Sequence, residues 1–132
     1  MSRIIFILAT LAVILILATA CSKTPQTATL TSANNGGKVE VKVGGQIIVN
    51  LDSNPSTGYT WETQSLDATM FKQVGDSVFS SSSPGLVGSG GTLALTFDTL
   101  KAGTSMLTLV YHRPWETGVD PTNTFTVTVT AK

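Results

Sequence analysis

The chain has 132 residues and a formal net charge of zero, and only 12% of its residues are charged. It contains no basic run, which argues against nucleic acid as a partner. Cys21 is the only cysteine, so an intrachain disulfide is excluded.

The first twenty residues are typical of a targeting segment and not of a folded domain. A short positive start and a long apolar run lead up to Cys21. This layout predicts a secretory signal peptide over residues 1–20. The small residues before Cys21 also resemble a bacterial lipobox, with Ala18 at the usual leucine position. We therefore expect a lipidated Cys21 at the mature N-terminus, followed by a polar tether over residues 21–27.

An uncleaved membrane anchor is the alternative interpretation of this segment. The apolar run over residues 4–20 lies at the short limit of the roughly 17–25 residues that span a bilayer. In both cases the folded part lies outside the cytoplasm and is tied to a membrane. The predicted location is the cell envelope, facing the periplasm or the exterior.

Residues 28–132 carry β-strand patterning. Apolar and polar residues alternate, and β-branched residues are frequent. The predicted strands, named in chain order, are A (38–43), B (46–51), C (60–65), D (71–79, interrupted), E (92–98), F (104–111) and G (124–130). These short strands, separated by Gly, Pro and Asn, predict an all-β domain, an antiparallel β-sandwich of about seven or eight strands. We expect it to be monomeric.

The alternation also predicts the core. Trp61 is a candidate core anchor in strand C. The other residues expected to face inward are Val39, Val41, Val43, Ile47, Val49, Leu51, Leu93, Leu95, Phe97, Phe125, Val127 and Val129.

The order of the strands predicts where the loops lie. If successive strands run up and down, the connections after B, D and F meet at one end of the sandwich. A tight turn at Gly44-Gly45 and the turns after C and E then lie at the other end. The three connections that meet carry the most distinctive residues of the chain.

The connection from B to C reads Asn54-Pro55-Ser56-Thr57-Gly58-Tyr59. Proline fixes φ and Gly58 can take a positive φ, so this segment can serve simply as a chain reversal. In the functional interpretation Thr57, which is small and can donate or accept a hydrogen bond, is the tip of a wedge.

The connection from D to E is rich in serine and ends in Gly88-Ser89-Gly90-Gly91. Alone, this composition is typical of a flexible loop. It fits neither a dinucleotide loop nor a P-loop, because no helix follows and no Gly-Lys-Ser/Thr is present. Bare glycines do permit close approach of a partner's backbone.

The connection from F to G contains Arg113-Pro114-Trp115. Tryptophan and arginine are enriched at binding hot spots. In the alternative interpretation, Trp115 folds back over the end of the sandwich as a lid, and Arg113 pairs with Glu116 or Asp120.

Together the three connections resemble the chagasin family, which inhibits papain-like cysteine proteases. That family has an Asn-Pro-Thr-Thr-Gly-Phe-like loop, a Gly-x-Gly-Gly loop and an Arg-Pro-Trp or Arg-Pro-Phe loop in the same order. Ser56 stands here for a common threonine and Tyr59 for another aromatic residue. The resemblance covers roughly residues 28–131.

The resemblance implies an immunoglobulin-like sandwich that inhibits papain-like cysteine proteases reversibly, tightly and competitively, by occluding the active-site cleft with its BC, DE and FG loops. By analogy, Thr57 meets the catalytic Cys–His pair, the glycine loop follows one side of the cleft, and Arg113 and Trp115 pack on the other. The implied protease-binding residues are Asn54, Pro55, Ser56, Thr57, Gly58, Tyr59, Gly88, Ser89, Gly90, Gly91, Arg113, Pro114 and Trp115.

The residue inventory argues against an enzyme. His112 is the only histidine, the carboxylates are scattered singly, and the spacing indicates neither a metal site nor a cofactor site. We expect His112 to be an exposed neighbour of the third loop. The alternative to an inhibitor is a structural or adhesive envelope lipoprotein whose loops bind another surface.

Overall fold

The computed structural model describes residues 25–132, so the expected signal peptide and Cys21 lie outside the described residues. Two short 3₁₀ turns, Ser32–Asn34 and Pro55–Thr57, accompany nine strands in this part of the chain. The strands are β1 (Thr27–Thr31), β2 (Lys38–Val41), β3 (Gln46–Ser53), β4 (Thr60–Ser65), β5 (Phe71–Gln73), β6 (Val78–Ser81), β7 (Gly91–Thr99), β8 (Gly103–His112) and β9 (Asn123–Ala131).

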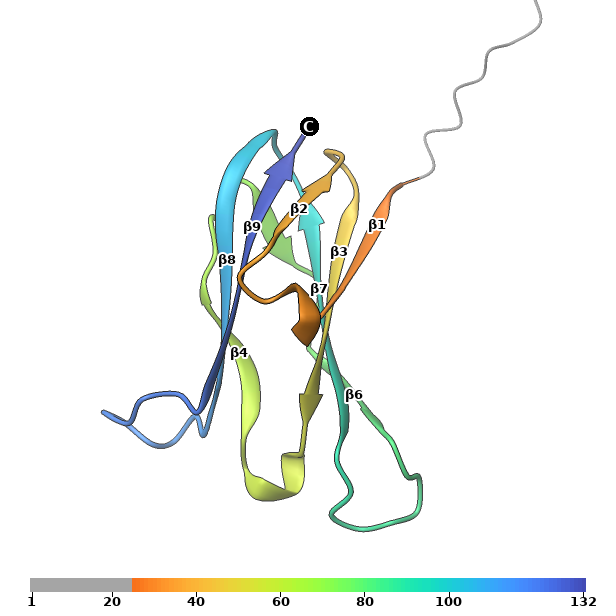
Figure 1. Cartoon of the computed structure of the whole chain (residues 1–132), viewed down its shortest axis with the longest axis vertical. Helices are drawn as coiled ribbons and strands as arrows, with labels where there is room; N and C mark the ends of the chain where they lie inside the picture. Colours follow the sequence, from red (N-terminus) through yellow and green to blue (C-terminus); the bar gives the residue numbers. More distant parts are fainter. Residues whose placement is uncertain (1–24) are drawn as a thin grey trace, which may run out of the picture.

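The strands form two sheets that face each other, as Figure 1 shows. One sheet has the order β1-β3-β7-β5, with β6 also paired to β7, and the other has the order β2-β9-β8-β4. The long central pairs, β3 with β7 and β8 with β9, are antiparallel. The all-β sandwich predicted from the sequence is therefore confirmed.

The expectation of a purely antiparallel sandwich is wrong at two edges. Strand β1 runs parallel to β3, and β2 runs parallel to β9. The reason is that β2, which lies between β1 and β3 in the chain, belongs to the opposite sheet. Two reversals of direction bring the chain back alongside β1 in the same sense. Both sheets are mixed in consequence.

The first predicted strand is shorter than expected. Strand β2 ends at Val41, and Val43 is 44% exposed, so the inward orientation predicted for Val43 is wrong. The turn at 42–45 carries the chain from one sheet to the other and does not close a hairpin within a sheet. Its backbone is tied to both sheets, because the N–H of Val43 donates to the carbonyl of Lys132 and the N–H of Gly44 to that of Thr99.

The weak strand predicted at 71–79 is divided into β5 and β6. Both pieces pair with β7, and the segment between them makes a turn at Gly75, where φ is +62°. This division, together with the added β1, raises the number of strands from the predicted seven or eight to nine.

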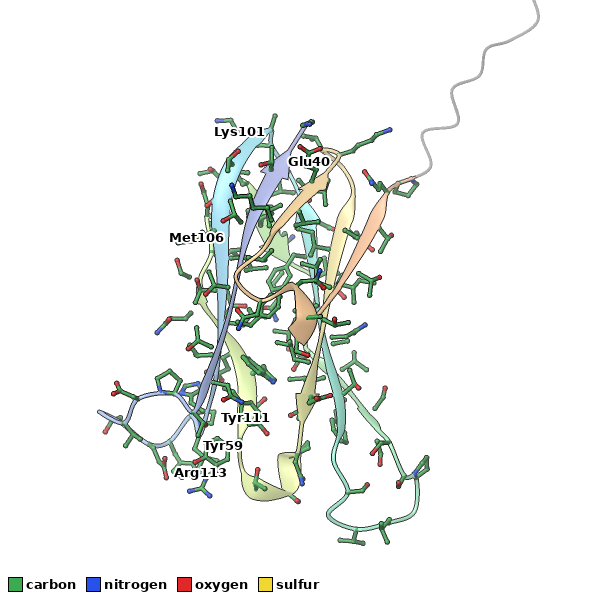
Figure 2. All side chains as sticks on the ribbon, viewed as in Figure 1. Glu40, Tyr59, Lys101, Met106, Tyr111 and Arg113 are labelled. Carbon is green, nitrogen blue, oxygen red and sulfur yellow. The ribbon has the colours of Figure 1, made fainter. Side chains whose placement is uncertain are left out.

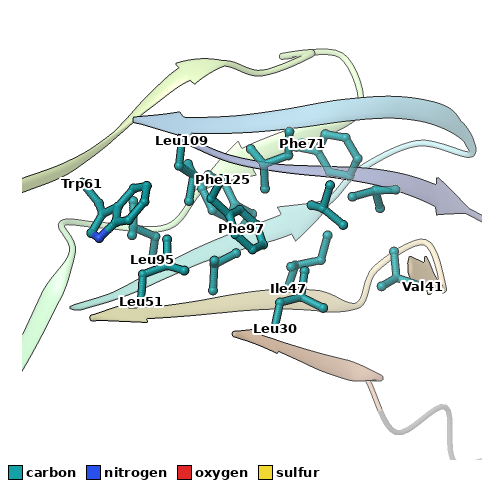
Figure 3. Packing of buried hydrophobic residues seen from close by; sticks show 14 of the residues in the cluster. Leu30, Val41, Ile47, Leu51, Trp61, Phe71, Leu95, Phe97, Leu109 and Phe125 are labelled. Atoms are coloured by element: carbon teal, nitrogen blue, oxygen red, sulfur yellow. The ribbon is translucent and has the colours of Figure 1, made fainter. Parts of the chain in front are cut away.

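The core lies between the two sheets, where the inward-facing side chains of β3, β7, β8 and β9 meet (Figure 3). Apart from Val43 and the half-buried Val39, every residue predicted to face inward is buried. Trp61 is buried as well, and its indole N–H donates to the carbonyl of Asp52 at 2.9 Å. Each such side chain contributes about 1.5–3 kcal/mol by leaving water, so this cluster is the main source of stability.

The two ends of the sandwich differ in character (Figure 1). The connections after β3, β6 and β8 lie together at one end, which we call the loop end. The start of β1, the turn at 42–45 and the C-terminus lie at the opposite end, which we call the tether end. The strand order predicts this separation. Among residues 25–132 no helix is long and apolar enough to cross a bilayer.

Candidate functional site: three loops at one end of the sandwich

Three loops form the loop end: loop 1 (54–59), loop 2 (82–90) and loop 3 (113–122). Loop 1 is a single 3₁₀ turn with Pro55 at its start. The Asn54 carboxamide oxygen accepts from the backbone N–H of Ser56, and Gly58 ends the turn at φ +80°. The Thr57 hydroxyl donates to the Asn54 carbonyl at 2.6 Å. Loop 1 is therefore a tightly bonded tip on which Thr57 is exposed.

Loop 1 is bonded directly to loop 2. The side-chain amide of Asn54 donates to the carbonyl of Gly88 at 3.2 Å. Gly88 has a φ of +81°, a conformation that other residues rarely adopt. The same asparagine thus caps loop 1 with its oxygen and holds loop 2 with its nitrogen.

Loop 1 is also bonded to loop 3. The guanidinium Nε of Arg113 donates to the carbonyl of Thr57 at 3.1 Å. The guanidinium carbon of Arg113 lies 4.6 Å from the centre of the Tyr59 ring. Arg113 also pairs with Glu116 at 3.1 Å, as one sequence interpretation proposed. Arg113 therefore orders loop 1 as well as loop 3.

A stack of aromatic rings supports this corner of the site. Tyr111 lies between Tyr59 and the buried Trp61, with ring centres 5.4 Å and 5.1 Å away. Its hydroxyl accepts the backbone N–H of Asn54 at 3.1 Å. Figure 2 shows Tyr59, Tyr111 and Arg113 clustered at the loop end. The stack links the core to the tips of loops 1 and 3.

Trp115 does not cover the sheets. Its indole lies against Gly58 of loop 1, so closely that a Cβ at that glycine would overlap the ring. The side chain nonetheless remains 67% exposed. The lid interpretation of Trp115 therefore does not describe this structure, and an aromatic surface faces solvent beside Thr57.

Serine side chains order the base of loop 2. The hydroxyls of Ser81 and Ser89 are 2.8 Å apart, and the Ser82 hydroxyl donates to the carbonyl of Gly90 at 2.7 Å. A flexible loop was one expectation from composition, yet these bonds span its two sides. Loop 2 therefore projects from the sandwich with its base held by internal hydrogen bonds.

Gly90, the last residue of loop 2, and Gly91, the first residue of β7, differ in whether the fold requires glycine. Gly91 begins β7, and a Cβ there would overlap the carbonyl oxygen of Ser80. At Gly90, by contrast, a Cβ would lie 3.5 Å from the carbonyl oxygen of Ser53, which is an ordinary contact. The fold itself therefore does not require glycine at position 90.

The chain matches the Chagasin family peptidase inhibitor I42 over residues 40–129. It belongs to the chagasin family. Chagasin of Trypanosoma cruzi is 35% identical over 103 residues, which cover 74% of this chain and 92% of chagasin. This membership confirms the family that the loop motifs predicted. It also confirms that the chain is an inhibitor and not an enzyme.

Solved structures agree with the chagasin assignment. The crystal structure of the cysteine protease inhibitor EhICP2 from Entamoeba histolytica has a TM-score of 0.69 and 25% identity, covering 80% of this chain and 95% of that one. PbICP-C in its complex with falcipain-2 has a TM-score of 0.51 at 18% identity, covering 82% and 91%. The second likeness shows a shared fold alone.

Several residues of this chagasin-family loop end were not singled out from the sequence. Leu86 and Val87, at the tip of loop 2, are 67% and 100% exposed. Two adjacent apolar residues in a Ser/Gly loop were a visible signal for them. Tyr111 carries no such signal, because its role depends on the rings that pack on either side of it.

His112 is the last residue of β8, next to loop 3 as expected, but its side chain is half-buried and not exposed. Its ring lies 2.8 Å from the Glu62 carboxylate on the neighbouring strand. Within residues 25–132, no three His, Cys, Asp or Glu side chains gather as a metal site.

Proposed function

We propose that this chagasin-family protein is a reversible, tight-binding competitive inhibitor of papain-like cysteine proteases. Loops 1, 2 and 3 occlude the active-site cleft together. The observation that carries the proposal is that loop 1 is bonded both to loop 2 and to loop 3, which are distant from it in sequence, so that the three loops gather at one end (Figure 1). The name of EhICP2 as a cysteine protease inhibitor supports this target class.

Each loop has a role in the proposed complex. Thr57 enters the cleft between the catalytic cysteine and histidine of the protease. The backbone around Gly90 follows one side of the cleft, while Arg113 and Trp115 pack on the other side. Because internal bonds already fix the loops, docking loses little conformational entropy, which favours tight binding.

The bonding of loop 1 also explains how it can resist cleavage. The carbonyls of Asn54 and Pro55 accept backbone N–H groups within the turn. The carbonyl of Thr57 accepts from Arg113. A thiolate needs a carbonyl in attack geometry, and these carbonyls are turned toward the inhibitor itself. Inhibition is then occlusion without covalent chemistry.

Titration against papain and a cathepsin-like protease tests the proposal. We expect competitive, reversible inhibition with a constant on the order of nanomolar, the range of well-packed interfaces. Absence of inhibition at micromolar concentration contradicts the proposal. An adhesive role would then be reconsidered, although no contact in the described residues favours it.

Thr57→Arg sharpens this test. The added side chain extends the exposed tip of loop 1 beyond what a cleft shaped for threonine can accept, so inhibition should be largely lost. Thr29→Arg is the matched control, because Thr29 is also exposed but lies on β1, away from the loops. Equal inhibition by both variants would remove Thr57 from the interface.

The proposal includes the location of the inhibitor. Residues 1–20 direct export, lipid on Cys21 anchors the chain to the cell envelope, and residues 21–27 connect the anchor to a monomeric inhibitor domain. The signal layout of the sequence supports this part of the proposal.

A further inference from the structure

The chain enters the sandwich at the end opposite the loops. Thr27 pairs with Gln46, the first residue of β3, and the N–H of Gln46 donates to the carbonyl of Gln26 at 2.9 Å. Strand β3 then runs to Ser53, directly before loop 1. At about 3.3 Å a residue, β3 alone separates the entry point from loop 1 by about 25 Å.

The entry point is fixed and not free to move along the sandwich. All of β1, from Thr27 to Thr31, pairs with β3 in parallel register. Leu30 of β1 is 3% exposed and belongs to the core. An anchor on the N-terminal segment would therefore hold the domain by its tether end.

The tether is too short to invert the domain. From Cys21 to Gln26, both included, the chain has six residues, which span at most about 20 Å when fully extended. To place the loop end on the membrane, the tether would have to run back along β3 and past loop 1, which exceeds that reach. The long axis of an anchored domain can be upright on the membrane or tilted, but the loop end cannot face the bilayer.

We infer that the anchored protein holds loops 1, 2 and 3 away from the membrane surface, toward proteases dissolved in the aqueous compartment. The inference rests on the proposed inhibitor function and on the membrane tie of the N-terminus. It deepens that function by naming the accessible targets. A protease whose cleft opens close to the bilayer is outside the reach of the loops.

Charged side chains of both signs lie at the tether end. Lys42, Lys101 and Lys132 are exposed there, and Figure 2 labels Lys101 and Glu40 at this end. Glu40 pairs with Lys132 at 2.9 Å, and hydrogen bonds from Thr69 lower the pKa of the Asp67 carboxyl, which keeps it charged. Charges of both signs lie at this end, so the orientation comes from the position of the tether.

Fluorescence quenching in vesicles tests the orientation without any inhibition assay. The full chain, purified from membranes, would carry Val43→Cys at the tether end or Val87→Cys at the tip of loop 2, each labelled with a thiol-reactive fluorophore. Both valines are exposed, and a lipidated Cys21 thioether does not react with the label. In phosphatidylethanolamine–phosphatidylglycerol vesicles with nitroxide-headgroup lipid, we expect quenching at position 43 to be at least five-fold greater than at position 87. Equal quenching, or more at position 87, overturns the inference.

Inhibition of papain by the unlabelled wild-type protein, in vesicles of the same lipids, is the functional test. We expect the inhibition constant in vesicles to agree with that in detergent within about two-fold, and a Gly/Ser linker inserted after Ser22 to change nothing. Inhibition ten-fold weaker in vesicles and restored by the linker would overturn the inference. Loss of inhibition in detergent as well would reject the inhibitor function, and the quenching ratio would still decide the orientation.

Discussion

At the scale of single residues, the fold requires some residues of the loop end and does not require others. Gly58 and Gly88 adopt positive φ angles, and Gly91 has no room for a Cβ. Gly90 meets neither condition. Thr57 and Trp115 are exposed although both lie against other loop residues. Residues of the second kind are the candidates for contact with a partner.

Alanine at positions 90 and 91 should have opposite effects. Gly91→Ala forces a Cβ against the Ser80 carbonyl, and such overpacking typically costs about 1–3 kcal/mol of unfolding free energy. Gly90→Ala should change stability by less than about 0.5 kcal/mol yet weaken inhibition, because a Cβ would keep the protease backbone at a distance. Thermal unfolding and papain inhibition measure the two effects. Wild-type inhibition by Gly90→Ala would show that no protease backbone approaches there.

Trp115→Ala should weaken inhibition with little change in melting temperature. The indole is 67% exposed in the free protein, and truncating an aromatic residue that a partner buries can cost ~2 kcal/mol or more, about 30-fold in affinity. Papain inhibition and thermal unfolding should be measured on the same sample. A lower melting temperature with intact inhibition would mean that Trp115 stabilises loop 1 and does not contact the protease.

At the scale of elements, the strands position the loops and the loops then hold one another. Strand β8 brings Tyr111 beneath loop 1, and β4 places Trp61 behind it. The side chains of Asn54 and Arg113 reach across to loops 2 and 1. Loop 1 is therefore bonded to both other loops. A substitution in the supporting strand β8 should alter the conformation of the loop tips.

Tyr111→Phe tests this coupling. The variant keeps the stacked ring but leaves the Asn54 N–H without its acceptor, and a hydrogen bond of this kind contributes about 0.5–1.5 kcal/mol. We expect faster hydrogen exchange at the Asn54 amide and roughly five-fold weaker inhibition. Tyr59→Phe is the control for the exchange measurement, because it leaves the Tyr111 hydroxyl in place. Unchanged exchange in Tyr111→Phe would mean that the turn holds loop 1 without help from β8.

At the scale of the whole molecule, the sandwich has a tether end and a loop end on opposite sides (Figure 1). The strand parity that gathers the loops also places the start of β1 away from them. The proposed anchor and the proposed inhibitory loops therefore lie at separate ends, and neither should disturb the other.

Cys21→Ser should release the protein from membranes without affecting inhibition. A serine cannot form the thioether that carries the lipid, whereas the loops lie at the far end of the sandwich. Membrane fractionation and mass spectrometry of the mature N-terminus are the measurements. A variant that stays in the membrane with residues 1–20 attached would support the uncleaved anchor.

The sequence by itself determined the all-β class, the inward faces of most strands and the end at which the loops meet. Alternation and turn residues act locally, so they are readable from the chain. The loop motifs likewise identified the family. The inward orientation predicted for Val43 was wrong, because the chain crosses to the other sheet there. The alternation of apolar and polar residues does not reveal that crossover.

Only the tertiary structure decided the parallel edges and the bonding of the site. The pairing of β1 with β3 depends on where β2 lies, which no local pattern encodes. The contact of Arg113 with Thr57 joins residues that are 56 positions apart, and that of Asn54 with Gly88 joins residues 34 apart. Such contacts form because two sheets bring strand ends together, so their partners become known only when the whole chain is folded.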